Sequence, residues 1–231
     1  MRLLAVAPVD HPGGADLVLA DSAAVARALA PLRAEAVYGP VDPDPPAADA
    51  PWPAGNGPVV GFVGRIEPRK GPLDLARAAP AIRGARAVIV GEDPYGSDPG
   101  YTAQVDRAPG IERYGWVENA PGLMRHLDVL VLPSRREPFG TVISEAMAVG
   151  TPVVATRVDG LPEVVEDGVT GFIVENEEQA VRAVGDLGRL DRRKVRARFE
   201  ERFSADRMAR AYERAYRELI SAAAEHSAAA S

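Results

Sequence analysis

The sequence contains no cysteine, and its three histidines, His11, His126 and His226, lie far apart along the chain. The absence of cysteine excludes disulfides, thiolate metal sites and cysteine nucleophiles together, and scattered histidines give no metal cluster. No apolar run approaches the ~20 residues that span a bilayer, and the apolar start is too short for a secretory signal. We therefore expect a cytoplasmic protein with no transmembrane segment and no metal.

Lysine is also scarce, because only Lys70 and Lys194 among the 27 basic residues are lysines and the others are arginines. The 33 acidic residues give a formal net charge of -6, which argues against a general affinity for nucleic acid. Any anion site must therefore be local. With 46% hydrophobic residues in 231, the chain resembles ordinary globular proteins and can bury a sizeable core.

From residue 59 onward, short apolar runs such as VVGFV, ARAVIV and DVLVL alternate with helical patterns. Strands that are apolar throughout, separated by helices of about ten residues, are typical of a parallel sheet covered on both faces. The pattern predicts a doubly wound, Rossmann-like α/β domain over residues 58–220. Its end beyond residue 175 is expected to be helical, followed by a frayed tail at 221–231.

Residues 1–40 predict a smaller β/α unit. Apolar runs at 2–9, 17–20 and 34–38 are expected to be strands, and Asp21-Ser22 offers a cap for a helix at 23–29. Proline, glycine and acidic residues then dominate over 41–57 without periodicity, which is typical of a linker.

The loops that follow the strands are where a ligand is expected, because open α/β sheets bind ligands at the carboxyl ends of their strands. In residues 64–71, GRIEPRKG, Arg65 and Lys70 lie between a strand and a helix opened by Pro72. A basic loop at a helix N-terminus can hold a phosphate group, and a lysine in so arginine-rich a chain suggests that a compact ammonium is required. A solvated turn with incidental charges is the alternative.

A second loop, EPFGTVISE at 137–145, begins with Glu137, opens a helix near Thr141 and places Glu145 in that helix's second turn. The amides at the helix start suit a pyrophosphate. Carboxylates on either side of it would accept hydroxyl groups at the two ends of an extended ligand, a layout that a nucleotide sugar has. The alternative is that Glu145 is an exposed helix residue and Glu137 a favourable charge near the helix dipole.

A third loop, at 114–117, ends a strand with Gly115 and Trp116. The aromatic side chains could wall a base pocket, and core packing of Trp116 is the alternative.

Three separated motifs, GRIEPRKG, EPFGTVISE and TPVVATRVDGLPEVVEDGVTGFIV, together resemble the nucleotide-sugar-binding half of the GT-B glycosyltransferases, specifically glycosyltransferase family 4. The likeness runs in order from residue 59 to residue 219. It implies a retaining transferase that needs no cofactor and no obligatory metal. One departure is Asp159, where this family commonly has a second glycine before Gly160.

The resemblance also implies roles for individual residues. Arg65 and Lys70 would neutralise the donor diphosphate, Glu137 would hold hydroxyls of the donor sugar, and Glu145 would bind the ribose. The remaining donor-binding residues would contribute backbone groups or the base pocket: Gly64, Phe139, Gly140, Thr141, Gly115 and Trp116.

Residues 1–40 resemble the first and last parts of the family's acceptor-binding half without its middle, and the family's acceptor-side histidine has no counterpart. The acceptor would then be held by this remnant, with Gly13 and Gly14 near the phosphates, or by a second copy or partner chain. A nucleotide-sugar-binding module that is not competent alone is the alternative. A dinucleotide-binding Rossmann domain is disfavoured because no G-x-G-x-x-G follows an early strand.

Overall fold

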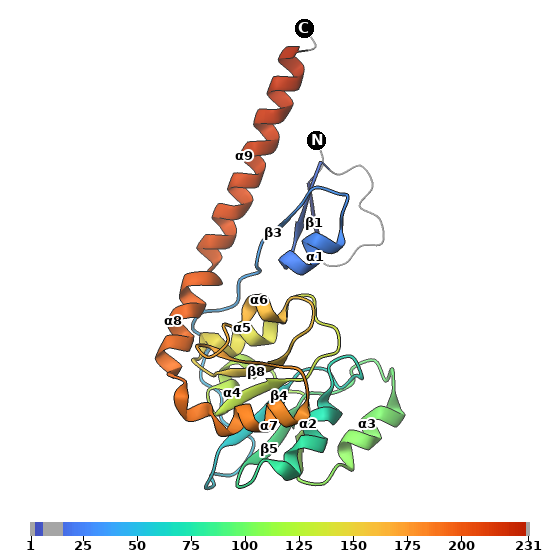
Figure 1. The fold of residues 1–231 in the computed structure, drawn as a ribbon, viewed down its shortest axis with the longest axis vertical. Coiled ribbons are helices and arrows are strands. Elements are labelled where there is room, and N and C mark those ends of the chain that lie inside the picture. Colours follow the sequence, from blue (N-terminus) through green and yellow to red (C-terminus); the bar gives the residue numbers. More distant parts are fainter. Residues whose placement is uncertain (1–2, 7–15, 230–231) are drawn as a thin grey trace.

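The computed structural model describes residues 3–6 and 16–229, which form two parallel sheets joined by the linker (Figure 1). The larger sheet has six strands in the order β6-β5-β4-β7-β8-β9, and the prediction of a doubly wound domain is confirmed. Its strands are β4 (Val59–Val63), β5 (Arg86–Val90), β6 (Ile111–Tyr114), β7 (Val129–Leu132), β8 (Val153–Thr156) and β9 (Gly171–Val174).

Helices cover both faces of this sheet, which explains why its central strands are apolar throughout. Helices α2 (Pro72–Ala78), α3 (Pro99–Asp106) and α7 (Glu177–Gly185) lie on one face, and α4 (Ala120–Met124), α5 (Thr141–Ala148) and α8 (Arg192–Arg202) on the other. Val60, Leu130 and Val154 are consequently 0% exposed. Two short 3-10 turns, Ala79–Ala81 and Leu187–Arg189, follow α2 and α7.

Helix α3 was not predicted, because it carries too few apolar residues to show a helical period. Only Tyr101 and Val105 are buried in it. The sequence did contain a start signal, since the Asp98 side chain accepts a hydrogen bond from the Tyr101 amide and Pro99 occupies the first helical position.

A crevice is expected where β4 and β7 meet, because the chain winds away from these neighbours in opposite directions. The loops that follow the two strands touch there. Gly71 has a φ of 72°, and a Cβ atom on it would lie 2.1 Å from the carbonyl oxygen of Pro133. A glycine at this position thus lets the basic loop after β4 approach the loop after β7.

The N-terminal residues form a small parallel sheet, β1 (Leu3–Val6), β2 (Leu17–Ala20) and β3 (Ala34–Ala36), with helix α1 (Ala23–Ala28). Leu17 and Leu19 of β2 pack against Ala215 and Leu219 of the long helix α9 (Ala205–Ala229). The predicted helical C-terminus is confirmed. Helix α9 runs past residue 221, where the sequence suggested a frayed tail, because its alanine-rich end has high helix propensity.

The linker lies along the larger domain and is held there by arginines. Arg125 Nη2 donates to the Pro45 carbonyl at 2.9 Å, and Arg196 pairs with Asp44 at 3.1 Å and also donates to the Pro43 carbonyl. Trp52 is 7% exposed and packs on Tyr114 with ring centroids 5.7 Å apart. The linker has no regular secondary structure, yet its path is fixed.

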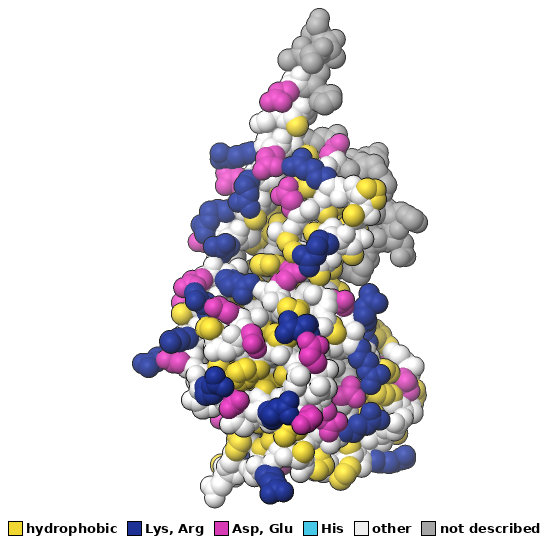
Figure 2. Space-filling view, viewed as in Figure 1, with side chains coloured by type: hydrophobic (Ala, Val, Ile, Leu, Met, Phe, Trp, Pro, Cys, Tyr) yellow, Lys and Arg dark blue, Asp and Glu magenta, His cyan; other side chains and the backbone are white. Residues whose placement is uncertain are grey.

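Charged side chains of both signs are interspersed over the face of the molecule that Figure 2 shows. Within the described part of the chain, no helix is both long enough and apolar enough to cross a membrane.

Candidate functional site

A cavity of about 460 Å³ opens at the carboxyl ends of β4, β5 and β7. The structure brings together on its walls seven of the residues singled out from the sequence: Gly64, Arg65, Lys70, Trp116, Glu137, Thr141 and Glu145. They come from three loops and from helix α5. The structure therefore has a cavity where the strand pattern predicts a crevice, and these seven residues line it.

Lys70 and Glu137 meet inside this cavity. The Lys70 ammonium Nζ donates to Oε2 of Glu137, and the two side chains are only 15% and 7% exposed. The Ser134 hydroxyl also donates to Oε2, at 3.4 Å. An ammonium has three donors, so Lys70 can neutralise Glu137 and still bind an anionic ligand.

Asp159 fixes the backbone of Glu137. Its Oδ2 accepts the Glu137 amide at 2.8 Å and lies 3.4 Å from Nε of Arg136. Asp159 has a φ of 41°, a left-handed conformation that aspartate tolerates better than most residues. Sequence reasoning noted Asp159 only as a replacement for glycine and missed this contact, although aspartate where glycine is common was an available signal.

Glu145 lies half-buried in the second turn of α5 and lines the cavity. Burial raises the pKa of its carboxyl above the usual range. The exposed-helix alternative is therefore wrong for Glu145. A carboxylate that faces a cavity can accept hydrogen bonds from vicinal hydroxyl groups.

The start of α5 contributes only partly to the cavity walls. Thr141 and Val142 line them, whereas Phe139 and Gly140 do not. Phe139 is 5% exposed, and its ring stacks on Tyr38 at 5.5 Å between centroids. Gly140 has a φ of 83° and caps the helix. These two residues thus shape the entry into α5 rather than the wall.

Trp116 is 69% exposed at the cavity mouth, so the core-packing alternative for it is wrong. Gly115 does not line the cavity. A Cβ on Gly115 would lie 2.7 Å from Oε1 of Glu92, and that same oxygen accepts the Trp116 amide at 3.1 Å. Glu92 lines the cavity as well. It lies in the sequence GEDPYG at 91–96, whose glycine and proline are typical of an ordinary turn, so Glu92 is not among the residues predicted from the sequence.

The charges around the cavity suit a ligand that carries both an anion and hydroxyl groups. Arg65 is 47% exposed and pairs with Glu67 at 3.3 Å, and Lys70 is the second lining cation. Three carboxylates also line the cavity: those of Glu92, Glu137 and Glu145. Among the residues that the structure describes, no three histidines or acidic residues are placed to hold a metal ion.

The small N-terminal sheet is fastened beside the cavity through Glu163 of α6 (Leu161–Val164). Oε2 and Oε1 of Glu163 accept the backbone amides of Ala23 and Ala24, each at 2.7 Å. This contact between distant segments was not foreseen. Gly13 and Gly14, expected near the phosphates, lie outside the described residues.

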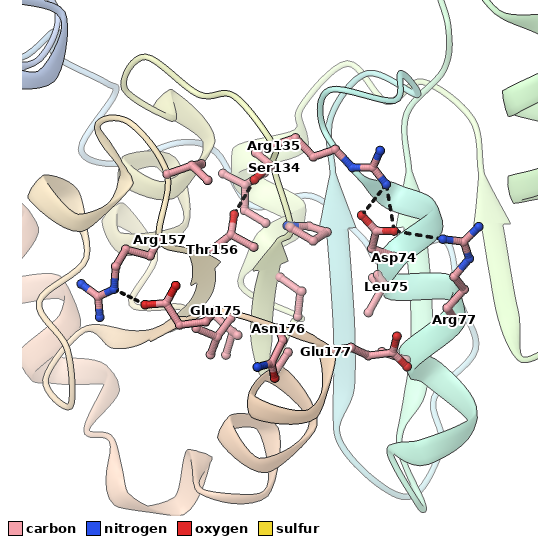
Figure 3. A pocket seen from close by; sticks show the side chains of 18 of the residues that line it. Asp74, Leu75, Arg77, Ser134, Arg135, Thr156, Arg157, Glu175, Asn176 and Glu177 are labelled. Carbon is pink, nitrogen blue, oxygen red and sulfur yellow. Dashed lines mark hydrogen bonds and ion pairs between the residues drawn. The ribbon is translucent and has the colours of Figure 1, made fainter.

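A second hollow, of about 500 Å³, lies between α2 and α7 (Figure 3). Each of its three arginines is paired: Arg77 with Asp74 at 3.5 Å, Arg135 with Asp74 at 3.2 Å, and Arg157 with Glu175 at 2.5 Å. None of the catalytic or donor-binding residues predicted from the sequence lines it. Each of its cations is therefore paired with a carboxylate inside the hollow.

The family model described as glycosyl transferases group 1 matches residues 57–189. D-inositol 3-phosphate glycosyltransferase of Mycobacterium tuberculosis is 39% identical over 147 residues, which cover 57% of this chain and 30% of that protein. The chain thus aligns with less than a third of the length of this curated relative.

Solved structures share the fold over most of the chain. Anabaena HepE in complex with UDP-glucose has a TM-score of 0.75 and 25% identity, covering 88% of this chain and 64% of that one. Sucrose-phosphate synthase of Thermosynechococcus elongatus has a TM-score of 0.76 and 27% identity, covering 90% of this chain and 59% of that one.

Proposed function

Because the chain belongs to the glycosyl transferases group 1 family, we propose that it transfers a sugar from a nucleoside diphosphate sugar to a hydroxyl acceptor, with retention at the anomeric carbon. One observation carries this proposal: Lys70, Glu137 and Glu145 line a single cavity at the carboxyl ends of the strands. A relative of similar fold, HepE, was crystallised with UDP-glucose, which supports a donor of this class.

The cavity residues then take complementary roles. Arg65 and Lys70 bind the diphosphate and stabilise the charge that grows on it as the bond from the anomeric carbon breaks. Glu137 accepts hydroxyls of the transferred sugar, and Glu145 accepts those of the ribose. Trp116, exposed at the mouth, offers a flat surface for the base. The two cations would supply this stabilisation without a resident metal.

In the proposed reaction, the bond between the anomeric carbon and the diphosphate oxygen breaks, and the acceptor oxygen bonds to the same face of that carbon. The acceptor's proton passes to the departing diphosphate oxygen. Electrostatic stabilisation of the leaving group is the main contribution of the protein. Its donors are held in place beforehand, since Lys70 is anchored on Glu137 and Glu137 on Asp159.

A binding module that holds the nucleotide sugar without transferring it is the second candidate. It is favoured by the small size of the N-terminal sheet, because the described residues provide only the three short strands β1-β2-β3 beside the larger domain.

One experiment separates the two functions. The chain is incubated with labelled UDP-glucose or a GDP-sugar and a mixture of small hydroxyl acceptors, and both released nucleotide and glycosylated product are measured. A labelled product supports transfer. Nucleotide binding with no product supports the module, and no binding of either UDP or GDP in calorimetry contradicts both.

A further inference from the structure

A third hollow, of about 350 Å³, lies where the chain after β3 passes beside the start of helix α9 (Figure 1). We call it the arginine hollow, because four arginines line it: Arg202, Arg207, Arg210 and Arg214. The other described residues on its walls are uncharged, so none of the described lining residues is a carboxylate. Its volume is within the range of small-molecule sites, ~300–1,000 Å³.

Two of these arginines have free side chains. The guanidinium groups of Arg207 and Arg214 are exposed and make no hydrogen bond or ion pair within the described part of the chain. Arg210 lies 3.9 Å from Asp206, and both of these side chains are largely exposed. In the hollow between α2 and α7, by contrast, each arginine is paired with a carboxylate that also lines that hollow. The donors of Arg207 and Arg214 are therefore available to a ligand.

The arrangement of charge along α9 is unfavourable in the free protein. Arg207, Arg210 and Arg214 are three and four positions apart, so they are neighbours on one face of the helix. Like charges at this spacing destabilise a helix. A multiply charged anion in the hollow would offset this repulsion, so the free energy of binding would include its relief.

The fourth arginine, Arg202, is held in place at the end of α8. Its Nη1 donates to the Val164 carbonyl at 3.2 Å, and its Nη2 donates to the Glu163 carbonyl. The guanidinium also lies 5.0 Å from the centroid of the Phe203 ring. Because a guanidinium has five N–H donors, these two bonds leave further donors for a ligand. Arg202 therefore offers a cation whose position is fixed before a ligand binds.

The arginine hollow lies where the chain passes twice between the small sheet and the larger domain. Residues 36–38 lead from β3 toward the linker. Residues 202–214 lead from α8, which packs on α5 of the larger domain, into α9, which packs on β2. Both crossings contribute lining residues. A ligand in this hollow therefore contacts both connections between the two sheets.

Phosphate groups match these walls. Guanidinium groups bind phosphate oxygens through paired, charge-assisted hydrogen bonds. One phosphate monoester carries about −1.5 to −2 at pH 7, so four arginines match two such groups better than one.

The exposed apolar residues of α9 favour a free compound over a lipid headgroup. Tyr216 is nine positions, about two and a half turns, beyond Arg207, so it lies on the opposite side of the helix. Ile220 follows one turn later, and both side chains are exposed. A membrane that met the arginines would leave these two side chains in water.

We propose that the arginine hollow is a second ligand site, and that it binds a free small molecule carrying two or more phosphate groups. The bound anion pairs with Arg207 and Arg214 and stabilises the arrangement of the small sheet beside the larger domain. This site shares no lining residue with the donor cavity. The proposal is therefore independent of the proposed transfer function, and either can fail without the other.

The test measures the binding of inorganic pyrophosphate by calorimetry in metal-free buffer. The double variant Arg207→Gln/Arg214→Gln should weaken binding at this site at least tenfold, because it removes two charged partners of the anion. Pyrophosphate held in the donor cavity would persist in this variant, so the loss reports on the arginine hollow alone. The control is Arg83→Gln/Lys194→Gln, at two exposed side chains that line none of the three hollows. It changes net charge equally and should bind pyrophosphate within about twofold of the unmodified chain.

Thermal unfolding supplies a second measurement. Without ligand, Arg207→Gln/Arg214→Gln should unfold at the temperature of the unmodified chain or slightly above it, because it removes like charges and no side-chain contact. Pyrophosphate should raise the midpoint of the unmodified chain and of the control. The rise should be smaller in Arg207→Gln/Arg214→Gln.

The inference is overturned if pyrophosphate does not bind the unmodified chain, or if Arg207→Gln/Arg214→Gln binds it with the same affinity and stoichiometry. Flotation with vesicles tests the other source of phosphate, comparing phosphatidylcholine alone with a mixture of phosphatidylcholine and phosphatidylglycerol. We expect neither kind of vesicle to bind the chain. Binding to phosphatidylglycerol that is lost in Arg207→Gln/Arg214→Gln would assign the hollow to a lipid headgroup and overturn the proposal of a free ligand.

Discussion

Lys70 and Glu137 are 67 positions apart in the sequence, yet the Lys70 ammonium is hydrogen-bonded to the Glu137 carboxylate inside the donor cavity. The loop after β4 supplies the cation and the loop after β7 supplies the carboxylate. This pair is where the two halves of the doubly wound sheet combine into one site, and its members should therefore be sensitive to substitution for reasons of both binding and stability.

Replacing Lys70 by methionine should weaken UDP or GDP binding at least tenfold, or about 1.4 kcal/mol, in calorimetry. It should also lower the free energy of unfolding at neutral pH by as much as about 3–5 kcal/mol, because the buried Glu137 loses its partner. Lys70→Arg keeps a positive charge beside Glu137 and should fold normally. Any loss of nucleotide affinity in Lys70→Arg is therefore an effect on binding and not on stability. Lys194→Met, at the exposed second lysine, is the control. Equal nucleotide affinity in Lys70→Met and Lys194→Met would refute the role of Lys70.

Replacing Glu145 by glutamine should weaken nucleotide binding about tenfold, because a ribose hydroxyl loses a charged acceptor. It should also change the pH dependence of stability. Burial raises the pKa of Glu145 above its value in the unfolded chain, which is about 4.5. Between the two pKa values, the folded state therefore holds more protons than the unfolded state.

That difference means that Glu145 lowers stability progressively as pH rises through the window between its unfolded and folded pKa values, and the loss persists above it. The free energy of unfolding of Glu145→Gln should therefore fall less over this window than that of the parent. At pH 7 the variant should be more stable than the parent. Glu178→Gln, at a side chain 82% exposed on α7, is the matched control. A variant with lower stability than the parent at pH 7 would contradict this account.

Replacing Asp159 by glycine should relax the left-handed backbone and leave the unfolding midpoint nearly unchanged, but remove the acceptor that holds the Glu137 amide at 2.8 Å. We expect a severalfold drop in turnover or in nucleotide affinity. Asp159→Asn keeps an oxygen acceptor and tolerates the same backbone, so it should retain most activity. If the glycine variant is as active as the parent, Asp159 does not position Glu137.

Replacing Gly171 by alanine should destabilise the larger sheet, because a Cβ there would lie 1.9 Å from the Val153 carbonyl oxygen of the adjacent strand. A loss of at least about 1–3 kcal/mol is expected from such overpacking, seen as a lower unfolding midpoint. Gly185→Ala, at the end of α7 with nothing within 4 Å of the new atom, should instead gain up to about 1 kcal/mol. Similar midpoints for the two variants would contradict this packing.

Local patterns were sufficient to predict most of the larger domain and the main cavity residues. Apolar runs show which strands are buried on both faces, and the strand-end rule then places Lys70, Glu137 and Glu145 at one edge of the sheet. The contacts that position these groups were not predictable in the same way. Whether Asp159 reaches the Glu137 amide depends on a left-handed turn and on the path of a different loop.

Contacts between the two sheets could not be predicted from the sequence. Nothing near Glu163 in the sequence indicates that its carboxylate will cap α1, which lies 140 positions earlier in the chain. Glu92 was overlooked for a different reason: the strand-end rule does place its loop at this edge of the sheet, but the glycine and proline in that loop indicate an ordinary turn. Sequence periodicity identifies faces of elements, whereas these contacts depend on how elements meet.

The linker is bound mainly through its main chain. Arg125 and Arg196 donate to the carbonyl oxygens of Pro45 and Pro43, and every residue type has that oxygen. Apart from the buried Trp52 and from Asp44, which pairs with Arg196, the linker side chains can therefore be replaced without displacing the linker, whereas Arg125 and Arg196 are hard to replace. Tolerance to substitution should thus differ along this region. It should be high at most linker positions and low at the two arginines whose guanidinium groups bind the linker.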